Sequence, residues 1–273
     1  GLISLLLISI SMLVGRQTVL PLLAPSTGVV GLASALAVSG FWREEQERRR
    51  LRQTFERYVA PSVVQEILKD RDSAQGILRG KTLSVTVLFS DLEGFTALTR
   101  ERSQQGRSED LIDELNRYLG RMVDVITEHG GTVDKFIGDC VMAVFGSPVS
   151  RGIELEARQA VRCSVAMRKA LADLNQDWTE QGHQPLNCGI GLASGQAVVG
   201  HIGSPQHMDF TVIGDTVNLA SRLESLTREL RTPILMDEQT ARLAGAEIAT
   251  DNLGDKAIKG MDRCQVYRPK LSL

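Results

Sequence analysis

Two aspartates stand where the sequence predicts turns, and paired carboxylates at turns are candidate metal ligands. Asp91 follows the alternating run Leu83–Phe89, which has the period of a strand, and Asp139 follows Gly138 between two short β-prone runs. If that strand and that hairpin lie side by side in one sheet, the two carboxylates meet. Such a pair with open positions suits Mg²⁺, which prefers oxygen donors. Taken singly, each Asp is more typical of a turn or a helix cap.

A second set of polar residues has the chemistry to bind a nucleotide. Asn218 and Arg222 are four positions apart in a helical pattern, so they share one face of that helix. The planar guanidinium of Arg forms paired, charge-assisted hydrogen bonds with phosphate. Lys135 precedes Asp139 by four positions within a predicted strand. Taken singly, each of these residues is more typical of a solvated surface.

Hydrophobic periodicity indicates the elements that carry these residues. Apolar residues at helical spacing predict three long helices, and alternating residues predict strands and two hairpins. The predicted strands are Leu83–Phe89, Thr132–Ile137, Cys140–Phe145, Leu186–Leu192 and Ala197–Ile202, and the helices cover Leu111–Ile126, Val161–Leu174 and Val217–Leu230. This order favours an α/β sandwich, an antiparallel sheet with helices on one face.

Composition narrows the class of protein. The chain has 273 residues, 42 % of them hydrophobic, and a formal net charge of -2, so no basic field attracts it to nucleic acid. Its four cysteines are scattered without a CxxC pair, which favours reduced thiols over a zinc site. The first residue is Gly1 rather than Met, and we therefore expect the sequence to be the C-terminal part of a longer protein.

Long uncharged runs near the start predict membrane segments. Pro25–Trp42 approaches the length of a spanning helix, and Leu2–Val14 is interpreted as the end of an earlier span. The alternatives are a buried helix of a soluble domain for the first run and a signal-peptide core for the second. Arginines crowd the stretch after Trp42, and positive charge flanking a span marks its cytoplasmic side.

These patterns divide the chain into three parts. Residues 1–42 form the predicted transmembrane region of about two spans, the first truncated; residues 43–80 form a juxtamembrane helical connector; residues 81–273 form the folded domain. In the connector, Leu51, Phe55 and Tyr58 follow a helical stripe. The stripe either pairs with the same stripe of a second chain or packs on its own domain.

Three segments together resemble the class III nucleotide cyclases. Phe89–Thr96 resembles the metal-binding start of that family, Asp134–Asp139 running into Val141–Gly146 resembles its second metal motif, and Phe210–Glu224 resembles the third. They occur in the family's order between Lys81 and the end of the chain. The resemblance implies the ferredoxin-like cyclase fold, an α+β sandwich here preceded by transmembrane helices. It also implies a signalling enzyme that converts ATP to 3′,5′-cyclic AMP and pyrophosphate.

The resemblance implies a metal-binding role for the two aspartates. Asp91 and Asp139 would hold two divalent ions, Mg²⁺ or Mn²⁺, with help from the carbonyl of Leu92. Attack of the ribose 3′-hydroxyl on the α-phosphate would then be assisted by both metals.

Further roles follow from the same resemblance. Gly94, Phe95 and Thr96 would place backbone amides near the triphosphate. Asn218 would orient the ribose, and Arg222 would stabilise the charged transition state.

The choice of base and the phosphate site depend on four further positions. Lys135 favours adenine, because guanylate-specific relatives typically carry an acidic residue there. Thr211 stands where the commonest adenylate form has Asp; its hydroxyl can accept a hydrogen bond from the adenine amino group. In the family, Thr at this position marks a subgroup that includes bicarbonate-stimulated cyclases, so we expect activation by bicarbonate. Gly189 replaces a phosphate-binding Arg of some relatives, and Lys259 is the candidate substitute.

In the family the aspartates of one subunit face the Lys, Asn and Arg of the other. We therefore expect a homodimer with two shared sites, anchored through membrane lipid in the plasma (inner) membrane with the catalytic domain cytoplasmic. The short spans and the connector also resemble cyclases with an extracytoplasmic CHASE-type sensor. The expected small-molecule partner is ATP, and no nucleic acid is expected to bind.

Three other functions are considered. A guanylate cyclase is opposed by Lys135. A catalytically dead dimerising or nucleotide-sensing module is opposed by the simultaneous presence of both polar sets. A diguanylate cyclase of related fold is opposed by His129–Val133, which lacks the acidic signature of that class.

Overall fold

The protein is described here from a computed structural model. The structure describes residues 80–204, 207–258, 260 and 263–270, together with residues 8, 32–34, 36, 38, 39 and 42. The predicted membrane runs lie mostly outside these residues, and the connector stripe and Lys259 lie wholly outside them. Within the described part, no helix combines the length and the apolar character that crossing a bilayer requires.

The folded region alternates strands and helices in the order that the sequence predicts and adds elements at its C-terminal end. The helices are α5 (Phe95–Gln104), α6 (Ser108–Glu128), α7 (Ile153–Glu180), α8 (Asp215–Leu230) and α9 (Glu238–Ala244). The strands are β1 (Lys81–Leu92), β2 (Thr132–Ile137), β3 (Cys140–Phe145), β4 (Cys188–Ser204), β5 (His207–Ile213), β6 (Ile234–Asp237), β7 (Thr250–Lys256) and β8 (Cys264–Pro269). The last four elements after α8 were not predicted.

The strands form one sheet with β1 and β4 near its centre. The strand order is β2-β3-β1-β4-β6-β8-β7, and β5 pairs with β4 off this path. Strand β1 runs antiparallel to both β3 and β4, which confirms the expected neighbourhood of the first strand and the hairpin. The prediction of a wholly antiparallel sheet is wrong, because β4 and β6 pair in parallel.

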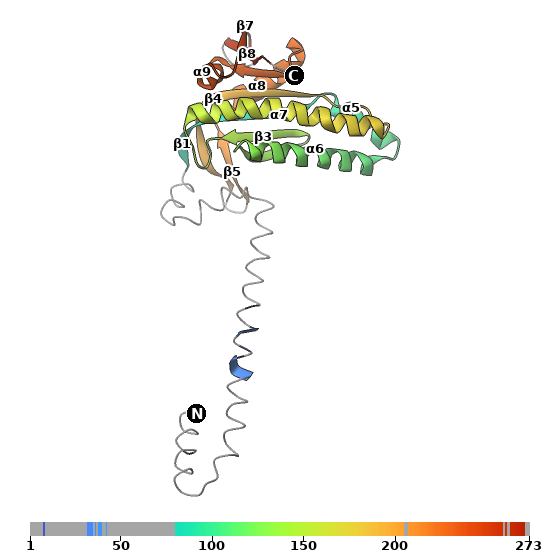
Figure 1. The fold of residues 1–273 in the computed structure, drawn as a ribbon, viewed down its shortest axis with the longest axis vertical. Helices are drawn as coiled ribbons and strands as arrows, with labels where there is room; N and C mark the ends of the chain where they lie inside the picture. The colour runs from blue at the N-terminus through green and yellow to red at the C-terminus, as the bar shows by residue number, and fades with distance from the viewer. Residues whose placement is uncertain are drawn as a thin grey trace. The chain divides into compact units, whose positions relative to one another are not determined.

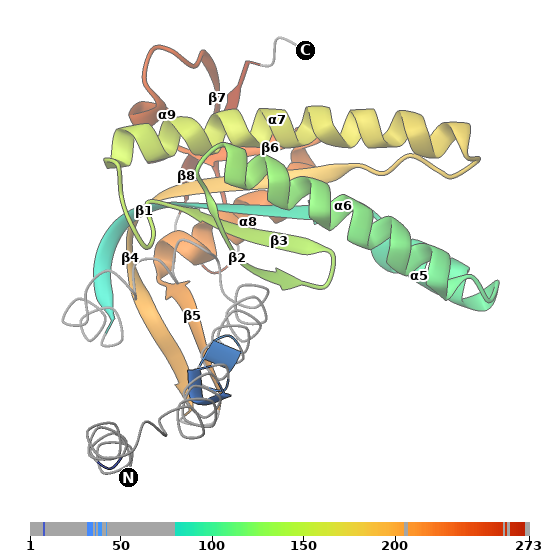
Figure 2. The ribbon, with the colours of Figure 1, turned by 60° about the horizontal axis from the view of Figure 1, so that its bottom comes forward.

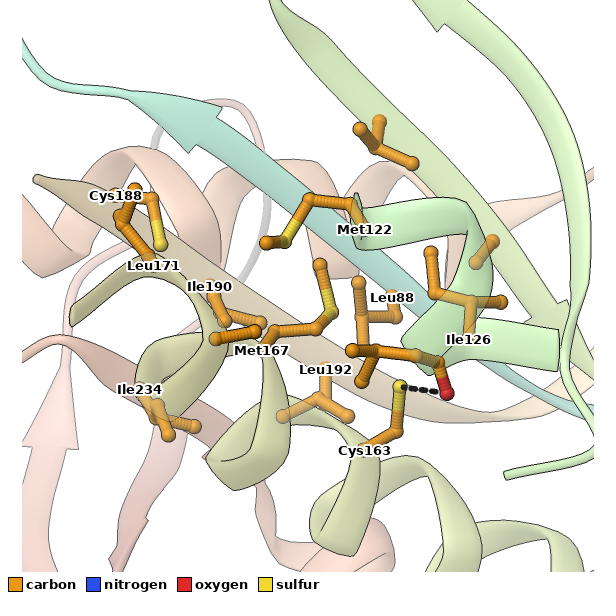
Figure 3. Packing of buried hydrophobic residues seen from close by; sticks show 14 of the residues in the cluster. Leu88, Met122, Ile126, Cys163, Met167, Leu171, Cys188, Ile190, Leu192 and Ile234 are labelled. Atoms are coloured by element: carbon orange, nitrogen blue, oxygen red, sulfur yellow. Dashed lines mark hydrogen bonds between the residues drawn. The ribbon is translucent and has the colours of Figure 1, made fainter. Parts of the chain in front are cut away.

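Helices cover both faces of the sheet, which corrects the prediction of one covered face (Figure 1). On one face Leu88 of β1 packs with Met122 of α6 and Met167 of α7 (Figure 3). Leu92 belongs to the same buried cluster. On the other face Val85, Val87 and Phe89 pack with apolar residues of α8. Strand β1 is therefore buried on both sides, as strands covered by helices on both faces usually are.

The second predicted hairpin is placed differently. Strand β4 runs without interruption through Ser194 and Gly195, and the hairpin partner of its C-terminal half is β5 (Figure 2). Gly195 serves close packing rather than a turn, since a Cβ there would stand 2.6 Å from the Thr216 hydroxyl on α8. Leu186, predicted as a strand residue, precedes the strand.

The first hairpin is placed as predicted, and each predicted long helix lies within a longer observed one. Strands β2 and β3 have the predicted bounds, and Gly138 adopts a left-handed φ of 67° in the turn between them. A glycine reaches this conformation at little cost, which explains its place in a two-residue hairpin loop. All four cysteines are free thiols, as expected.

Candidate active site

The structure brings Asp91 and Asp139 together. Ser90 of β1 pairs with Val141 of β3, so the turn that carries Asp139 lies beside the end of β1. Burial raises the pKa of the Asp139 carboxyl, and the negative charge of Asp91 raises it further. A backbone hydrogen bond at Leu92 acts in the opposite direction. The two acids therefore sit close enough to repel each other.

This pair fits a divalent cation by charge and donor type. Two oxygen-donor side chains crowd together, and a cation would relieve the repulsion between them. Among the described residues, no group of three or more His, Cys, Asp or Glu side chains could hold a metal ion. The candidate ligands are the carboxylates of Asp91 and Asp139, and the role of the Leu92 carbonyl stays a prediction.

The loop after β1 lies beside the same acid. Gly94 has a left-handed φ of 75° and precedes helix α5, whose first hydrogen bond runs from the amide of Ala97 to the carbonyl of Gly94. The amides of Phe95 and Thr96 thus stand at the open N-terminal end of the helix, where anions bind. Phe95, Thr96 and Asp139 line one cavity of about 500 Å³.

Two neighbours of the aspartates were missed by the sequence analysis. Arg228 of α8 donates a hydrogen bond from Nη2 to Oδ2 of Asp91, although 137 positions separate them. The same Nη2 lies 3.4 Å from Oε1 of Glu224, one helical turn earlier. Burial raises the pKa of Glu224 to about 7, while Arg228 lowers it. The i, i+4 spacing of Glu224 and Arg228 was the available signal, but it is common on helices.

Lys135 and Thr211 converge on a buried carboxylate. The Thr211 hydroxyl donates to Oδ2 of Asp134 over 2.7 Å, and the Lys135 ammonium lies 3.6 Å from the same oxygen. The Lys135 ammonium is also 3.9 Å from Asp209. The Asp134 side chain is only 5 % exposed, and burial raises its pKa. Asp134 is thus a third residue that the sequence analysis did not single out.

Asn218 and Arg222 occupy the exposed side of α8. Their neighbours Ala220 and Leu223 are buried against the sheet, whereas both polar side chains face outward. Within the described part of the chain, neither side chain forms a hydrogen bond or an ion pair. The structure therefore does not join this pair to Asp91 and Asp139 through any contact within one chain.

Gly189 lies directly opposite Asp91 in the β1–β4 pairing. A Cβ at this position would overlap the Thr227 hydroxyl and lie 3.3 Å from Oε1 of Glu224. A larger side chain therefore has no room at Gly189 while α8 is packed as it is. Lys259, the predicted substitute for a basic group here, is not among the described residues and stays a prediction.

Residues 79–269 match the family model described as the adenylate and guanylate cyclase catalytic domain. The chain belongs to this family. A cyclase family accounts for the acidic pair, the open helix N-terminus and the polar cluster around Lys135 in one domain.

Relatives of this cyclase domain include enzymes of both base specificities. The chain is 31 % identical to an adenylate cyclase of Anabaena cylindrica over 86 % of its own length and 45 % of the relative's. A crystal structure of the adenylyl cyclase CyaB from P. aeruginosa shares 39 % identity, with a TM-score of 0.66 and coverage of 72 % of this chain and 98 % of that one. The guanylyl cyclase Cya2 shares 38 %, with a TM-score of 0.62 over 70 % of this chain and 93 % of its own.

The chain spans less than half the length of the curated relatives that it matches. In the terminal-differentiation adenylate cyclase of Dictyostelium discoideum, 34 % identical, the match covers 60 % of this chain and only 7 % of the relative. Membership in the family is thus a statement about the catalytic domain.

Proposed function

We propose that this chain is an adenylate cyclase that converts ATP to 3′,5′-cyclic AMP and pyrophosphate. The observation that carries the choice of adenine is the hydrogen bond from Thr211 to Asp134. A hydroxyl has one proton and two lone pairs, so a hydroxyl that donates to a carboxylate keeps its lone pairs as acceptors. Thr211 is then suited to receive the adenine 6-amino group, while Lys135 donates to a ring nitrogen. A guanine carbonyl at the same place would meet an acceptor instead of a donor.

The remaining residues supply position and charge. Asp91 and Asp139, with the Leu92 carbonyl, would hold two divalent ions, Mg²⁺ or Mn²⁺. Such ions, when bound, lower the pKa of the 3′-hydroxyl and neutralise phosphate charge. The open amides of Phe95 and Thr96 face the triphosphate, and Asn218 orients the ribose. Arg222 stabilises the charge that develops on the α-phosphate, which is typically the largest single contribution in such sites.

We propose further that the active unit is a homodimer with two shared sites. Asn218 and Arg222 are exposed and find no acidic partner in their own described chain. Large apolar side chains are exposed near the base-recognition residues, namely Phe136 and Ile137 of β2, Val198 of β4 and Met208 and Ile213 of β5. Exposed apolar residues that gather in one region mark interaction surfaces. A second subunit would cover them and complete both sites.

Mixing two inactive variants tests the shared sites. Asp139→Ala removes a metal ligand, and Arg222→Ala removes the basic residue expected from the other subunit. Each alone should lose on the order of 10²–10³ in rate, and a mixture should recover part of it, because one of the two sites in a mixed dimer keeps all its residues. A mixture as inactive as its components would contradict the shared sites. Turnover of GTP in place of ATP by the parent would contradict the base assignment.

Two further proposals, on activation by bicarbonate and on membrane attachment, come from the sequence. Bicarbonate should raise cyclic AMP formation at fixed pH if Thr211 marks the stimulated subgroup, and a flat response would remove that idea. We also propose attachment to the inner membrane with the catalytic domain in the cytoplasm, on the strength of Pro25–Trp42 and the arginines after it. Recovery of the protein in the soluble fraction after cell lysis would contradict the attachment.

A further inference from the structure

Helix α8 packs so closely on β4 that position 189, opposite Asp91, has no room for a basic side chain. Gly189 and Gly191 face the helix, and a Cβ on Gly191 would overlap the backbone of Ala220 and Glu224. Two glycines in register therefore let the helix approach the strand more closely than side chains would permit. The consequence is that strand β4 offers no basic side chain next to Asp91.

The same close approach brings a guanidinium to that place from the helix. Arg228 lies at the C-terminal end of α8 and hydrogen-bonds Asp91, the strand neighbour of Gly189. Its side chain is 43 % exposed, so it is anchored at the acid yet open to solvent. An exposed ion pair of this kind is worth little by itself, and its exchange for another partner costs little.

The charges around Arg228 favour such an exchange. Three carboxylates, those of Asp91, Asp139 and Glu224, stand together with Arg228 as the one cation that the described residues pair with them. Among the described residues the buried Oε1 of Glu224 has no hydrogen-bond partner, and its nearest cation is the Arg228 guanidinium at 3.4 Å. Asp91 would hold a divalent ion in place of the guanidinium, and a phosphate oxygen of the substrate would offer Arg228 a new acceptor.

A cavity next to Arg228 is electropositive. Arg168 and Arg231 line it together with Arg228, against the single carboxylate of Glu93, in a volume of about 450 Å³. Arg168 donates to the carbonyl of Cys188 over 3.0 Å, and neither it nor Arg231 forms an ion pair with a described residue. An anion in this cavity would therefore meet Arg168 and Arg231 in addition to Arg228.

We propose that Arg228 binds the β- or γ-phosphate of the substrate, the group that leaves as pyrophosphate. It takes the place of a basic residue at position 189. Arg228 hydrogen-bonds Asp91 within its own chain and would exchange that carboxylate for a phosphate oxygen of the bound substrate. The inference rests on the proposed cyclase function for its substrate but makes a separate claim about pyrophosphate binding.

The test measures pyrophosphate and metal binding directly, without turnover. Isothermal titration of the 273-residue chain with pyrophosphate in the presence of Mg²⁺ is compared for the parent, Arg228→Ala, Arg228→Lys and Arg162→Ala. Arg162 is the matched control, because it pairs with Glu247 over 3.0 Å, and neither residue belongs to the acidic site. Mn²⁺ binding without nucleotide is titrated for the same variants, and the KM for ATP is measured alongside.

We expect Arg228→Ala to weaken pyrophosphate binding and to raise the KM for ATP, each by about ten- to a hundredfold, as for a lost hydrogen bond to a charged group. Arg228→Lys keeps the charge without the planar fork and should lose less. Mn²⁺ binding without nucleotide should tighten in Arg228→Ala, because a competing cation is removed from Asp91. Arg162→Ala should match the parent in every titration.

Three results would overturn the inference. One is unchanged pyrophosphate affinity in Arg228→Ala, and another is absence of pyrophosphate binding by the parent. The third is weaker Mn²⁺ binding in Arg228→Ala, which would make Arg228 a support for Asp91 rather than its competitor. If Arg228→Ala does not fold, Arg228→Lys becomes the deciding variant. Pyrophosphate affinity equal to that of the parent in Arg228→Lys would contradict a contact between the planar guanidinium and phosphate. A parent that binds pyrophosphate and forms no cyclic AMP would refute the proposed function alone.

Discussion

We predict that replacing glycine by alanine destabilises the fold at Gly191, where α8 packs on β4, and stabilises it at Gly120 on α6. Gly191→Ala would place a Cβ 2.8 Å from Cα of Glu224, where ordinary contact begins at 3.4 Å, and in overlap with two further backbone atoms. Helix α8 must therefore retreat by at least 0.6 Å, the difference between these distances. Gly120→Ala on α6 meets nothing within 4 Å and removes a flexible residue from a helix.

The magnitudes follow from the kind of contact. Overpacking costs about 1–3 kcal/mol, and backbone atoms that cannot rotate away place Gly191→Ala near the upper end. Alanine recovers about 0.5–1 kcal/mol of this through the unfolded chain, leaving a net loss of about 2–2.5 kcal/mol. For a domain of this size that is a fall in Tm of about 4–10 °C. Gly120→Ala should instead raise Tm by about 1–4 °C.

Thermal and urea unfolding of both variants check the signs, and cyclic AMP formation checks the consequence for α8. A helix shifted by a good fraction of an ångström carries Asn218, Arg222 and Arg228 out of place, and a displacement of about 1 Å can cost a hundredfold in rate. Equal stability of the two alanine variants, or a Gly191→Ala enzyme with full activity, would refute the packing argument.

Three further predictions concern single polar groups. The pKa of Glu224 is raised to about 7 from an ordinary 4.5, so its carboxyl binds a proton more tightly in the folded chain than in the unfolded chain. With metal chelated, its contribution to the free energy of unfolding should be full below pH 4.5 and lost as pH rises through 7. Urea unfolding of Glu224→Gln should lack this dependence on pH. Thr211→Val should lower the ratio of ATP to GTP turnover, and it should also cost stability because buried Asp134 loses a donor; an unchanged ratio would remove Thr211 from base selection. Asp237→Ala should lower the free energy of unfolding by about 1–3 kcal/mol in urea. The Asp237 carboxylate caps α9 by accepting a hydrogen bond from the amide of Thr240 at 3.0 Å, and it accepts another from the amide of Ser194 at 3.3 Å. A loss below about 0.5 kcal/mol would show that water replaces those bonds.

Periodicity predicted strand β1 but not the burial of both its faces. Thr86 and Ser90 of β1 look like solvent-facing positions in the sequence, yet both are fully buried. Thr86 shares a hydrogen bond of 2.8 Å with Ser194, and Ser90 one of 3.3 Å with Tyr118. Because a hydrogen-bonded hydroxyl can be buried at little cost, a polar residue in a strand does not identify the exposed face.

The break predicted within β4 has a related cause. Ser194-Gly195 reads as a turn, since both residue types favour one. In the structure, the Ser194 hydroxyl bonds Thr240, and Gly195 makes room for Thr216 of α8. Both residues serve contacts with elements distant in sequence. No local pattern contains those partners, so the strand could not be followed through them from the sequence alone.

The site was predictable to the extent that its residues lie in recognisable segments. Asp91 and Asp139 were expected to meet because adjacent strands bring their ends together. Arg228 and Asp134 were missed, since their roles depend on which distant residue they touch. The signal for Arg228 was indirect: a glycine at 189, facing a helix, leaves an acid without a nearby cation on its own sheet.

Helix α8 therefore couples packing to chemistry. Because α8 packs directly on Gly189 and Gly191, strand β4 has no room for a basic side chain at these positions. The same packing lets Arg228 hydrogen-bond Asp91. The two effects cannot be separated by changing the strand alone, because a side chain at 189 displaces the helix that carries Arg228. Adding Gly189→Arg to the Arg228→Ala variant should therefore fail to restore pyrophosphate binding. Recovery in that double variant would show that α8 can retreat without losing the site, against the packing that the glycines imply.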